Sequence, residues 1–470
     1  MTQADLTHDV SKGSVMQSYR AHSHWFNTAS DSQFSPALQN DLTADVCVIG
    51  GGINGLSTAY HLVRLDPNCR VVVLEKDVVG FGASGRNAGQ LVVSFGGADL
   101  GMLMKLYGPK KIAAALRYSE QGLAMLERLT AEERIDFDYD RTGYIKTALR
   151  AKGEGMLDKY MDCYERTGQS HHFTRMSEHE VQQELHSPYL GHALFDPRGG
   201  QFNPLKLIRG LKSAVVRHGG TIFENSPVAA VTREKTEIKV HTGMGSVRCQ
   251  RLVVATNAFS HQFPGLEDLG IQQAQTPLMI RAAITDPIPE HIWQEAGWPR
   301  RAGVNVFSPL FYSFAPTADG RILSVSGFHA QVPKGRSLEA EIAWQLRNDG
   351  HIGAFFPRLK EVRVAQTWGG PISITADQIP HVGATKDPRV FHVCGCWGHG
   401  MVLGTHHGRT LAELALGLQT ESTEMWFVKR AKKRWPTYFI GNLAASAGIA
   451  HNRFLGRRIA NRLTPPIKLT

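Results

Sequence analysis

One stretch, residues 45–75, constrains the fold of this chain more than any other. It reads DVCVIGGGINGLSTAYHLVRLDPNCRVVVLE, which predicts a strand, a tight turn, a helix and a second strand. The apolar run 46–49 is typical of a strand buried on both faces of a parallel sheet, and Pro67 ends the helix. The order predicts one βαβ unit.

Three glycines in the turn indicate what this unit binds. Gly50, Gly52 and Gly55 form G-x-G-x-x-G, a pattern that allows the turn, the approach of a pyrophosphate and close helix–strand packing. The phosphates would lie at the helix N-terminus. Glu75 ends the second strand, where a carboxylate accepts hydrogen bonds from a ribose 2′-hydroxyl group. A chance glycine turn is the alternative. The strand, the helix, the second strand and the acid that accompany the glycines favour a dinucleotide site.

Length and composition favour a globular enzyme of more than one domain. The chain has 470 residues, of which 42% are hydrophobic and 20% charged, and a single core rarely grows to this size. No apolar run reaches the length of a membrane span, and residues 1–10 lack the features of a secretion signal. We therefore expect a cytoplasmic protein.

The cysteines and histidines do not indicate a metal site. The 6 cysteines are scattered, and Cys394 and Cys396 lack C-x-x-C spacing and a second pair. His171 and His172 are adjacent and cannot share one helix face, so we interpret them as surface residues. We expect no metal.

The net charge of +10 is concentrated near one end of the chain. Residues 420–470 contain ten Lys and Arg residues against two Glu residues, so the remainder is nearly neutral and no nucleic-acid partner is expected. We interpret this basic C-terminal tail as a helical cap with solvated arginines. Weak contact with an anionic membrane surface, through these charges and the apolar residues 439–450, is the alternative.

The order of predicted elements indicates two interleaved domains. Helix and strand patterns typical of a dinucleotide domain return twice after the first βαβ unit, while prolines and short alternating runs elsewhere are typical of an antiparallel sheet. The fold class is therefore α/β with an antiparallel β part. We assign residues 1–44 to an N-terminal arm, 45–100, 200–262 and 365–419 to the dinucleotide domain, 101–199 and 263–364 to a substrate domain, and 420–470 to the tail.

A loop rich in glycine and small residues follows the second strand of the βαβ unit. Residues 79–91, VGFGASGRNAGQL, can bring many backbone N–H groups close to a ligand. An ordinary flexible loop is the alternative that composition leaves open.

Several motifs together carry a family resemblance. They are GGGINGLSTAYHL, the acid Glu75, GASGRNAGQ, PVAAV, RLVVATNA, TADQIPHVG and GCWGHG, in this order and spacing. With them the chain resembles FAD-dependent oxidoreductases of the D-amino-acid-oxidase type over roughly residues 20–420, and SGRNAGQ most resembles the γ-glutamylputrescine oxidase branch. The resemblance implies a glutathione-reductase-like FAD-binding Rossmann domain interleaved with an antiparallel sheet that covers the flavin.

The resemblance also implies which residues contact FAD. Residues 84–90 would follow the pyrophosphate toward the flavin, and Val228 would contact the adenine through its backbone. Residues 398–401 would lie at the flavin pyrimidine on a helix N-terminus, whose partial positive charge suits an anionic reduced flavin. For His399 a plain turn residue is the alternative. The implied FAD contacts are Gly50, Gly52, Gly55, Glu75, Ser84, Gly85, Arg86, Asn87, Ala88, Gly89, Gln90, Val228, Thr256, Gly398, His399, Gly400 and Met401.

Two departures from the family pattern bear on chemistry. Ile372 stands where carboxylate-recognising members have a basic residue, and an aliphatic side chain cannot bind a carboxylate, so a simple α-amino acid is disfavoured. GGPISITAD has no cysteine and GASGRNAGQ no histidine to tether the flavin, so we expect non-covalent FAD. The candidate substrate residues are Arg281, Tyr312 and Ile372, and the candidate catalytic residues are Arg86, Tyr312 and His399.

The predicted reaction is oxidation of the C–N bond of an amine to an imine, which water hydrolyses to an aldehyde, with oxygen as acceptor. Polyamine or amino-acid catabolism would use such a step. One alternative is a flavin dehydrogenase of an N-methyl, secondary or D-amino acid that passes electrons to a carrier. The other is a flavoprotein that binds a membrane or nucleic acid through its basic tail.

Overall fold

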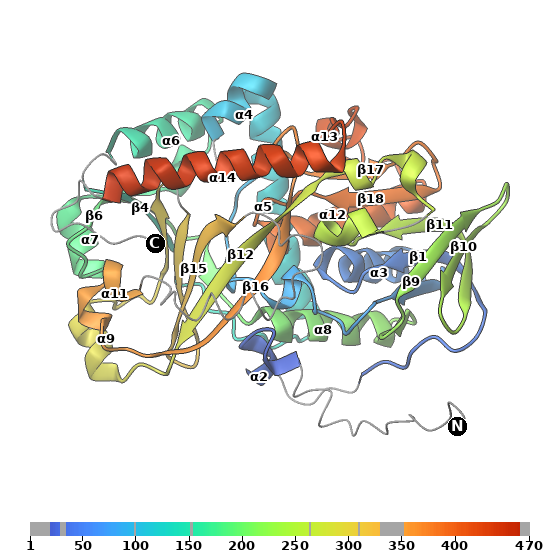
Figure 1. Ribbon diagram of the computed structural model, residues 1–470, viewed down its shortest axis with the longest axis horizontal. Coiled ribbons are helices and arrows are strands. Elements are labelled where there is room, and N and C mark those ends of the chain that lie inside the picture. Colours follow the sequence, from blue (N-terminus) through green and yellow to red (C-terminus); the bar gives the residue numbers. More distant parts are fainter. Residues whose placement is uncertain are drawn as a thin grey trace, which may run out of the picture.

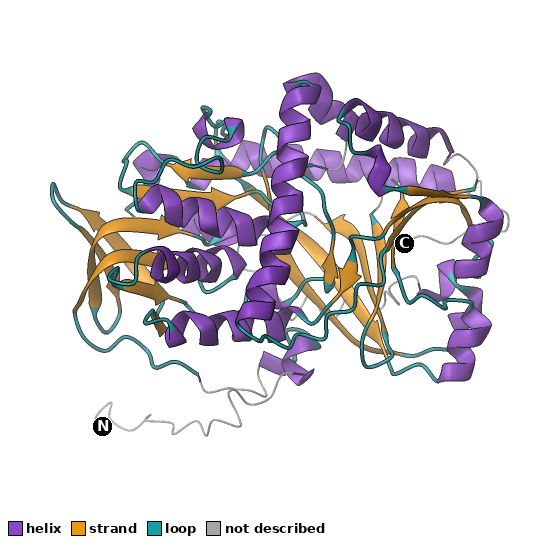
Figure 2. Ribbon diagram, turned by 180° about the vertical axis from the view of Figure 1, so that it is seen from behind, coloured by secondary structure: helices purple, strands orange, loops and turns teal. Residues whose placement is uncertain are grey.

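The computed structural model describes residues 19–28, 34–97, 100–150, 154–262, 265–308, 311–329 and 352–460. Parts of the expected arm (1–18 and 29–33), of the substrate domain (330–351) and of the tail (461–470) lie outside these ranges. Two sheets of eight strands lie side by side, with helices over their outer faces (Figure 2).

The first sheet is the Rossmann part of the fold. Its central strands run in the order β18–β11–β1–β2–β8 and are all parallel, while β17 adds an antiparallel edge and β9 and β10 form a ribbon on β11. The strands are β1 (Leu42–Ile49), β2 (Val71–Leu74), β8 (Thr221–Phe223), β9 (Val228–Arg233), β10 (Ile238–Thr242), β11 (Ser246–Val254), β17 (His381–Ala384) and β18 (Val390–Cys394).

Both faces of β1 are buried, as the apolar run in the sequence predicts. Val46 and Val48 pack toward the helices of the largest core cluster, and Cys47 and Ile49 pack on the opposite face with residues of the β9–β10 ribbon. The covering helices are α3 (Ile53–Leu65), α5 (Pro109–Glu132), α8 (Pro204–Arg217) and α12 (Gly400–Ala415). The cap that the sequence predicts for α8 is present, because Asn203 accepts a hydrogen bond from the Lys206 backbone N–H group at 3.2 Å.

The second sheet runs in the order β16–β12–β15–β14–β13–β4–β6–β5 and is antiparallel except for the pair β13–β4. Its strands are β4 (Tyr144–Leu149), β5 (Thr174–Met176), β6 (Leu190–Asp196), β12 (Thr276–Thr285), β13 (Gly303–Phe307), β14 (Tyr312–Pro316), β15 (Ile322–His329) and β16 (Val364–Ile374). A two-stranded ribbon joins β3 (Gln90–Leu91) to β7 (Gly200–Gln201). The remaining helices are α2 (Trp25–Thr28), α4 (Leu100–Tyr107), α6 (Glu154–Arg166), α7 (Glu178–Glu184), α9 (Glu290–Ala296), α11 (Ile352–Phe355), α13 (Trp426–Lys429) and α14 (Tyr438–Ala460). The α/β and antiparallel β fold class is confirmed.

Three predicted assignments differ from the structure. Helix α5 lies in the expected substrate domain 101–199, but it packs on α12 in the core of the dinucleotide domain. β1 begins at Leu42, inside the expected N-terminal arm. β16 pairs with β12 along its whole length, so residues 365–374 belong to the second sheet and not to the dinucleotide domain. Local patterning shows where a strand lies, but its sheet depends on long-range pairing that one sequence does not reveal.

The basic tail is part of the folded body as far as the structure describes it. Arg430 forms an ion pair with the buried Asp377, and Lys432 donates to the Val428 carbonyl at 3.1 Å. Helix α14 then crosses the second sheet over β12 and β15 (Figure 1). None of the described helices has the length and apolar character needed to cross a bilayer.

Candidate functional site

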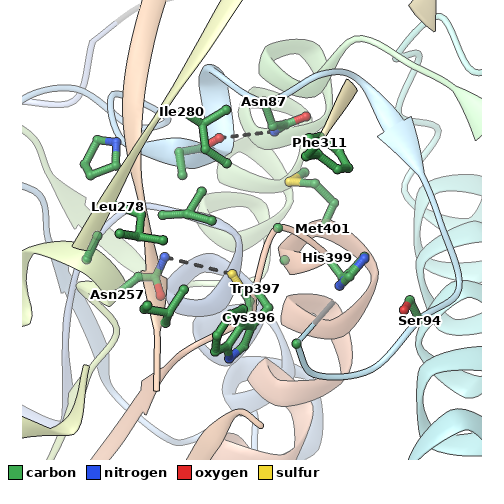
Figure 3. A pocket seen from close by; sticks show the side chains of 18 of the residues that line it. Asn87, Ser94, Asn257, Leu278, Ile280, Phe311, Cys396, Trp397, His399 and Met401 are labelled. Carbon is green, nitrogen blue, oxygen red and sulfur yellow. Dashed lines mark hydrogen bonds between the residues drawn. The ribbon is translucent and has the colours of Figure 1, made fainter. Parts of the chain in front are cut away.

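A cavity of about 1690 Å³ opens between the two sheets. Small-molecule pockets are commonly about 300–1,000 Å³, so this one has room for a dinucleotide together with a substrate. Figure 3 shows Leu278 and Ile280 of β12 on one side of the cavity and His399 and Met401 at the start of α12 on the other.

The first wall of the cavity is the glycine turn before α3. Gly50 has φ +112°, and a Cβ atom there would lie 2.8 Å from the Ala255 carbonyl oxygen. A Cβ on Gly55 would overlap the carbonyl oxygen of Gly50, which is the close packing predicted for the third glycine. Gly52 at the N-cap has no side chain to cap the helix, and Ser84 Oγ accepts a hydrogen bond from the Ile53 backbone N–H group at 3.0 Å, so the N-terminus of α3 borders the cavity with Ser84 beside it.

Glu75 lies at the end of β2 and lines the same part of the cavity. Its carboxylate accepts hydrogen bonds from the backbone N–H groups of Gly51 at 2.7 Å and Asp77 at 3.0 Å. Burial nevertheless raises the pKa of Glu75 to about 7. The turn therefore orients a carboxylate that still has lone pairs available for a ribose hydroxyl group.

The loop rich in glycine and small residues, 79–91, is fixed by hydrogen bonds to the second sheet and within itself. The Arg86 guanidinium donates to the carbonyl of Phe81 at 2.7 Å and to that of Gly369 at 3.1 Å, and Trp368 Nε1 donates to the Arg86 carbonyl at 2.9 Å. Burial lowers the pKa of Arg86 to about 10. Arg86 thus borders the cavity and ties the loop to β16 of the second sheet.

The second helix N-terminus at the cavity is that of α12. His399 occupies its N-cap without a side-chain cap bond, and its Nδ1 atom has no hydrogen-bond partner in the part of the chain that the structure describes. Burial, and next the positive charge of Lys146, lower the pKa of His399 to about 4. A neutral imidazole therefore faces the cavity at neutral pH.

These features fit FAD. Two helix N-termini, an oriented Glu75 and the Asn54 Oδ1 atom, which is buried without a partner in the described chain, all border one cavity. Most of the residues expected to contact FAD line it. Gly55, Gly85 and Gly89 do not appear in its lining, because each packs closely against backbone of a neighbouring segment.

The face of the second sheet that meets the cavity follows from strand register. Side chains of register partners point to the same face, so one row crosses the sheet from β12 to β4. The row consists of Ala282, Val325, Ser313, Asn305 and Lys146, all of which line the cavity.

The structure does not place Tyr312 at the site. Phe311 and Ser313 line the cavity, whereas the Tyr312 ring, 2% exposed, packs on Phe355 with ring centroids 5.0 Å apart. Alternation along the strand puts Tyr312 on the opposite face, so its expected contact with substrate is wrong. Arg281 and Tyr312 are both register partners of Ser326, on the two strands next to β15. Arg281 nevertheless borders the cavity.

Ile372 lines the cavity at an end that is apolar, which we call the apolar end. It is the register partner of Leu278, and both belong to a cluster with Ile374 and with Ile449 of α14. This supports the expectation that the position offers no partner for a carboxylate.

At the other end of the cavity-facing row lies Lys146, which our sequence reasoning did not select. With its neighbours Tyr144, Tyr160 and Asn305, it forms what we call the cationic end. The available signal was a lysine inside the alternating run TGYIKTAL. Helix α14 was also missed as a wall of the cavity, because its contacts with the second sheet are distant in sequence.

No group of three or more His, Cys, Asp or Glu residues suited to a metal occurs among the described residues. His172 instead lies with its Nε2 atom 3.0 Å from a carboxylate oxygen of Glu120, and both side chains are partly exposed. Cys396 lines the cavity as a free thiol.

Comparison with known proteins agrees with this geometry. The model of the DAO family, described as FAD dependent oxidoreductase, matches residues 45–414. The chain belongs to this family. It is an FAD-dependent oxidoreductase, as the resemblance in sequence implied.

Individual relatives cover most of the chain. Gamma-glutamylputrescine oxidoreductase of Escherichia coli is 29% identical over 84% of this chain and 89% of its own length. Sarcosine oxidase subunit beta of Rhodobacter capsulatus is 23% identical over 76% of this chain and 80% of its own length. Among solved structures, glycine oxidase from Bacillus cereus has a TM-score of 0.66 at 18% identity, covering 84% of this chain and 99% of that one. The last similarity concerns the fold alone.

Proposed function

We propose that this enzyme oxidises the C–N bond of an amine that has no carboxylate on the carbon undergoing oxidation. The observation that carries the proposal is the apolar end, where Ile372, Leu278 and Ile449 surround the position that would have to bind such a carboxylate. Burying an unpaired carboxylate among these side chains would cost several kcal/mol. The similarity to an oxidoreductase of γ-glutamylputrescine supports the same choice.

The reaction removes two electrons and two protons from the amine and leaves an imine. Water then adds to the imine, which gives an aldehyde and releases ammonia or a smaller amine. When bound, FAD supplies the two-electron oxidant, and dioxygen, reduced to hydrogen peroxide, is the proposed final acceptor.

The chain's own residues orient the reactants and keep water away. The turns before α3 and α12 present helix N-termini to the cofactor, and Arg86 fixes the loop between them. Neutral His399 adds no charge beside the reacting amine. The wall of α14 and β12 excludes water at the apolar end.

The decisive experiment is anaerobic mixing of the purified enzyme with matched pairs of amines and amino acids. n-Butylamine and mono-γ-glutamyl diamines should bleach the flavin absorbance faster than glycine, sarcosine or D-alanine. Readmission of air then separates an oxidase, whose flavin reoxidises at once, from a dehydrogenase that needs a carrier. Faster bleaching by a simple α-amino acid would contradict the proposal and direct attention to Arg281.

We also propose that FAD is held without a covalent bond. Burial raises the pKa of the Cys396 thiol, which keeps the cavity cysteine protonated and a poor nucleophile. Acid precipitation should therefore release all of the flavin into the supernatant, and colour in the pellet would contradict this expectation.

A weak membrane-surface contact is a second candidate property. The outward side of α14 exposes Phe439, Leu443 and Phe454 by 73%, 61% and 59%, with Arg458 exposed beside Phe454. Apolar residues flanked by basic ones suit an anionic lipid surface. The protein should sediment with phosphatidylserine vesicles but not with phosphatidylcholine vesicles. Equal recovery of the protein with both kinds of vesicle would contradict the membrane contact.

A further inference from the structure

Lys146 is a cation that faces the cavity from β4. It ends the cavity-facing row of the second sheet, with Asn305 as its register partner on β13. Its Nζ atom lies 3.8 Å from the ring centroid of Tyr160 and 4.9 Å from that of Phe307. Two aromatic rings therefore hold the ammonium group in a defined place.

The protein does not neutralise this charge with an acid. Within the described ranges no carboxylate lies at ion-pair distance from Lys146. The neighbouring Asp196 is already bonded to Arg198 through both oxygens, at 2.9 and 2.7 Å. Burial lowers the pKa of Lys146 to about 7, and Asp196 offsets this only in part. An ammonium group that lines a cavity without an acidic partner is suited to an anion that arrives with the ligand.

The surroundings add neutral polar groups and no competing anion. Asn305 and Tyr144 line the cavity beside Lys146, and the hydroxyl groups of Tyr160 and Tyr164 lie 3.0 Å apart. His399, the nearest cavity histidine on α12, is neutral at neutral pH. A carboxylate could therefore be bound by Lys146 with support from these groups.

Lys146 and the apolar end lie on strands that are far apart in the second sheet. Ala282 on β12 and Lys146 on β4 are separated by four strand spacings, about 19 Å at the usual spacing of neighbouring strands. A simple α-amino acid is much shorter than this row. The cationic end is therefore separate from the Ile372 position, where relatives are expected to bind a carboxylate.

We propose that Lys146 binds a carboxylate of a bifunctional substrate, one in which several bonds separate the carboxylate from the amine that is oxidised. The inference rests on the proposed amine oxidation and names the class of amine more closely. The substrate would have its carboxylate at Lys146 and would reach only to the start of α12, where His399 is close enough to feel the charge of Lys146.

The test compares two substrates of equal length, 6-aminohexanoate and hexylamine, in the FAD-bound enzyme. In the wild type, kcat/KM for 6-aminohexanoate should exceed that for hexylamine. Lys146→Met should lower this ratio by at least about 10-fold, the equivalent of about 1.4 kcal/mol, whereas Lys146→Arg should keep most of it. Lys159→Met removes an exposed lysine at the mouth of the same cavity and should leave the ratio unchanged.

A second measurement is independent of turnover. Hexanoate, which has no amine, should bind the holoenzyme and perturb the flavin spectrum, with a Kd that rises at least about 10-fold in Lys146→Met. If no amine bleaches the wild-type flavin, the proposed function fails while hexanoate binding still tests Lys146. Equal losses for both substrates in Lys146→Met and in the alternative variant Lys146→Gln, with unchanged hexanoate binding, would overturn the inference.

Discussion

The two ends of the cavity differ in how the chain builds them. The apolar end brings together β12, β16 and the distant helix α14, through Leu278, Ile372 and Ile449. The cationic end is built around β4, β13 and α6, through Lys146, Asn305 and Tyr160. The residues expected to bind the cofactor lie mainly on the first sheet. One oxidising centre can therefore serve different substrates, which the second sheet selects by the chemical groups at the two ends of the substrate.

The largest effect is expected from a charge placed at the apolar end. Ile449→Asp would set an unpaired carboxylate against Leu278 and Ile374, which costs several kcal/mol, and should detach α14 from the sheet. We expect kcat/KM for hexylamine to fall on the order of 100-fold. Ala447→Asp, exposed on the same helix, is the matched control. Similar losses in both variants would show that α14 does not form this end.

A basic residue at position 372 should give the apolar end a positive charge, as the cationic end already has. Ile372→Arg supplies a guanidinium at the apolar end, so glycine and D-alanine should gain relative to hexylamine by about 10-fold or more, as expected for a charge-assisted hydrogen bond. Ile372→Leu keeps the apolar character and should leave the preference unchanged. The measurement is the steady-state kcat/KM for glycine, D-alanine and hexylamine. An unaltered preference in Ile372→Arg would show that the carboxylate of an amino acid binds at another position.

Glu75 should affect cofactor binding without affecting either end. Glu75→Ala removes the acceptor for ribose hydrogen bonds of about 1.5–3 kcal/mol each, so the Kd for FAD should rise by at least about 10-fold. With saturating FAD, the ratio of 6-aminohexanoate to hexylamine turnover should match that of the wild type. An unchanged Kd would mean that Glu75 serves only the glycine turn, through its bonds to Gly51 and Asp77.

Much of the cofactor half could be predicted from the sequence because its constraints are local. A glycine turn, the helix after it and an acid at the next strand end lie within residues 45–75, and each has one physical interpretation. The substrate half depends on register instead. Tyr312 was selected where Ser313 faces the cavity, and a shift of one residue moves a strand side chain to the other face. Lys146 and α14 reach the cavity through pairings with segments far away in sequence.

The pH dependence should separate the ends, because only the cationic end depends on a titrating group. Lys146, with a pKa of about 7, is charged below that pH and loses its charge above it, so hexanoate affinity should fall several-fold between about pH 6 and pH 9. Among the facing groups, His399 stays neutral in this range, Asp196 is hydrogen-bonded to Arg198, and burial raises the pKa of Tyr144 and Tyr160. Hexanol, which is uncharged, should show no such dependence.

Lys146→Arg is the control for this pH profile, because arginine remains protonated throughout. Its hexanoate affinity should be nearly flat over the same range. A profile that falls equally in the wild type and in this variant would assign the titration to another group.

The smallest effect is expected at Tyr312. Tyr312→Phe removes a hydroxyl group on the far face of β14, so kcat/KM should stay within about 2-fold of the wild type for both substrates. Ser313→Leu, one residue along, fills the cavity-facing row and should slow both. Loss of activity in Tyr312→Phe alone would place that hydroxyl group in the cavity.

The position of α14 has a consequence for how the enzyme matures. By the time residue 415 has been synthesised, the nascent chain contains every strand that the structure describes in both sheets and both helices whose N-termini face the cofactor. The apolar wall is still missing, because Ile449 emerges later. A chain that ends between these two points therefore contains the cationic end, which β4, β13 and α6 build, but lacks the apolar wall that disfavours a carboxylate beside the reacting carbon.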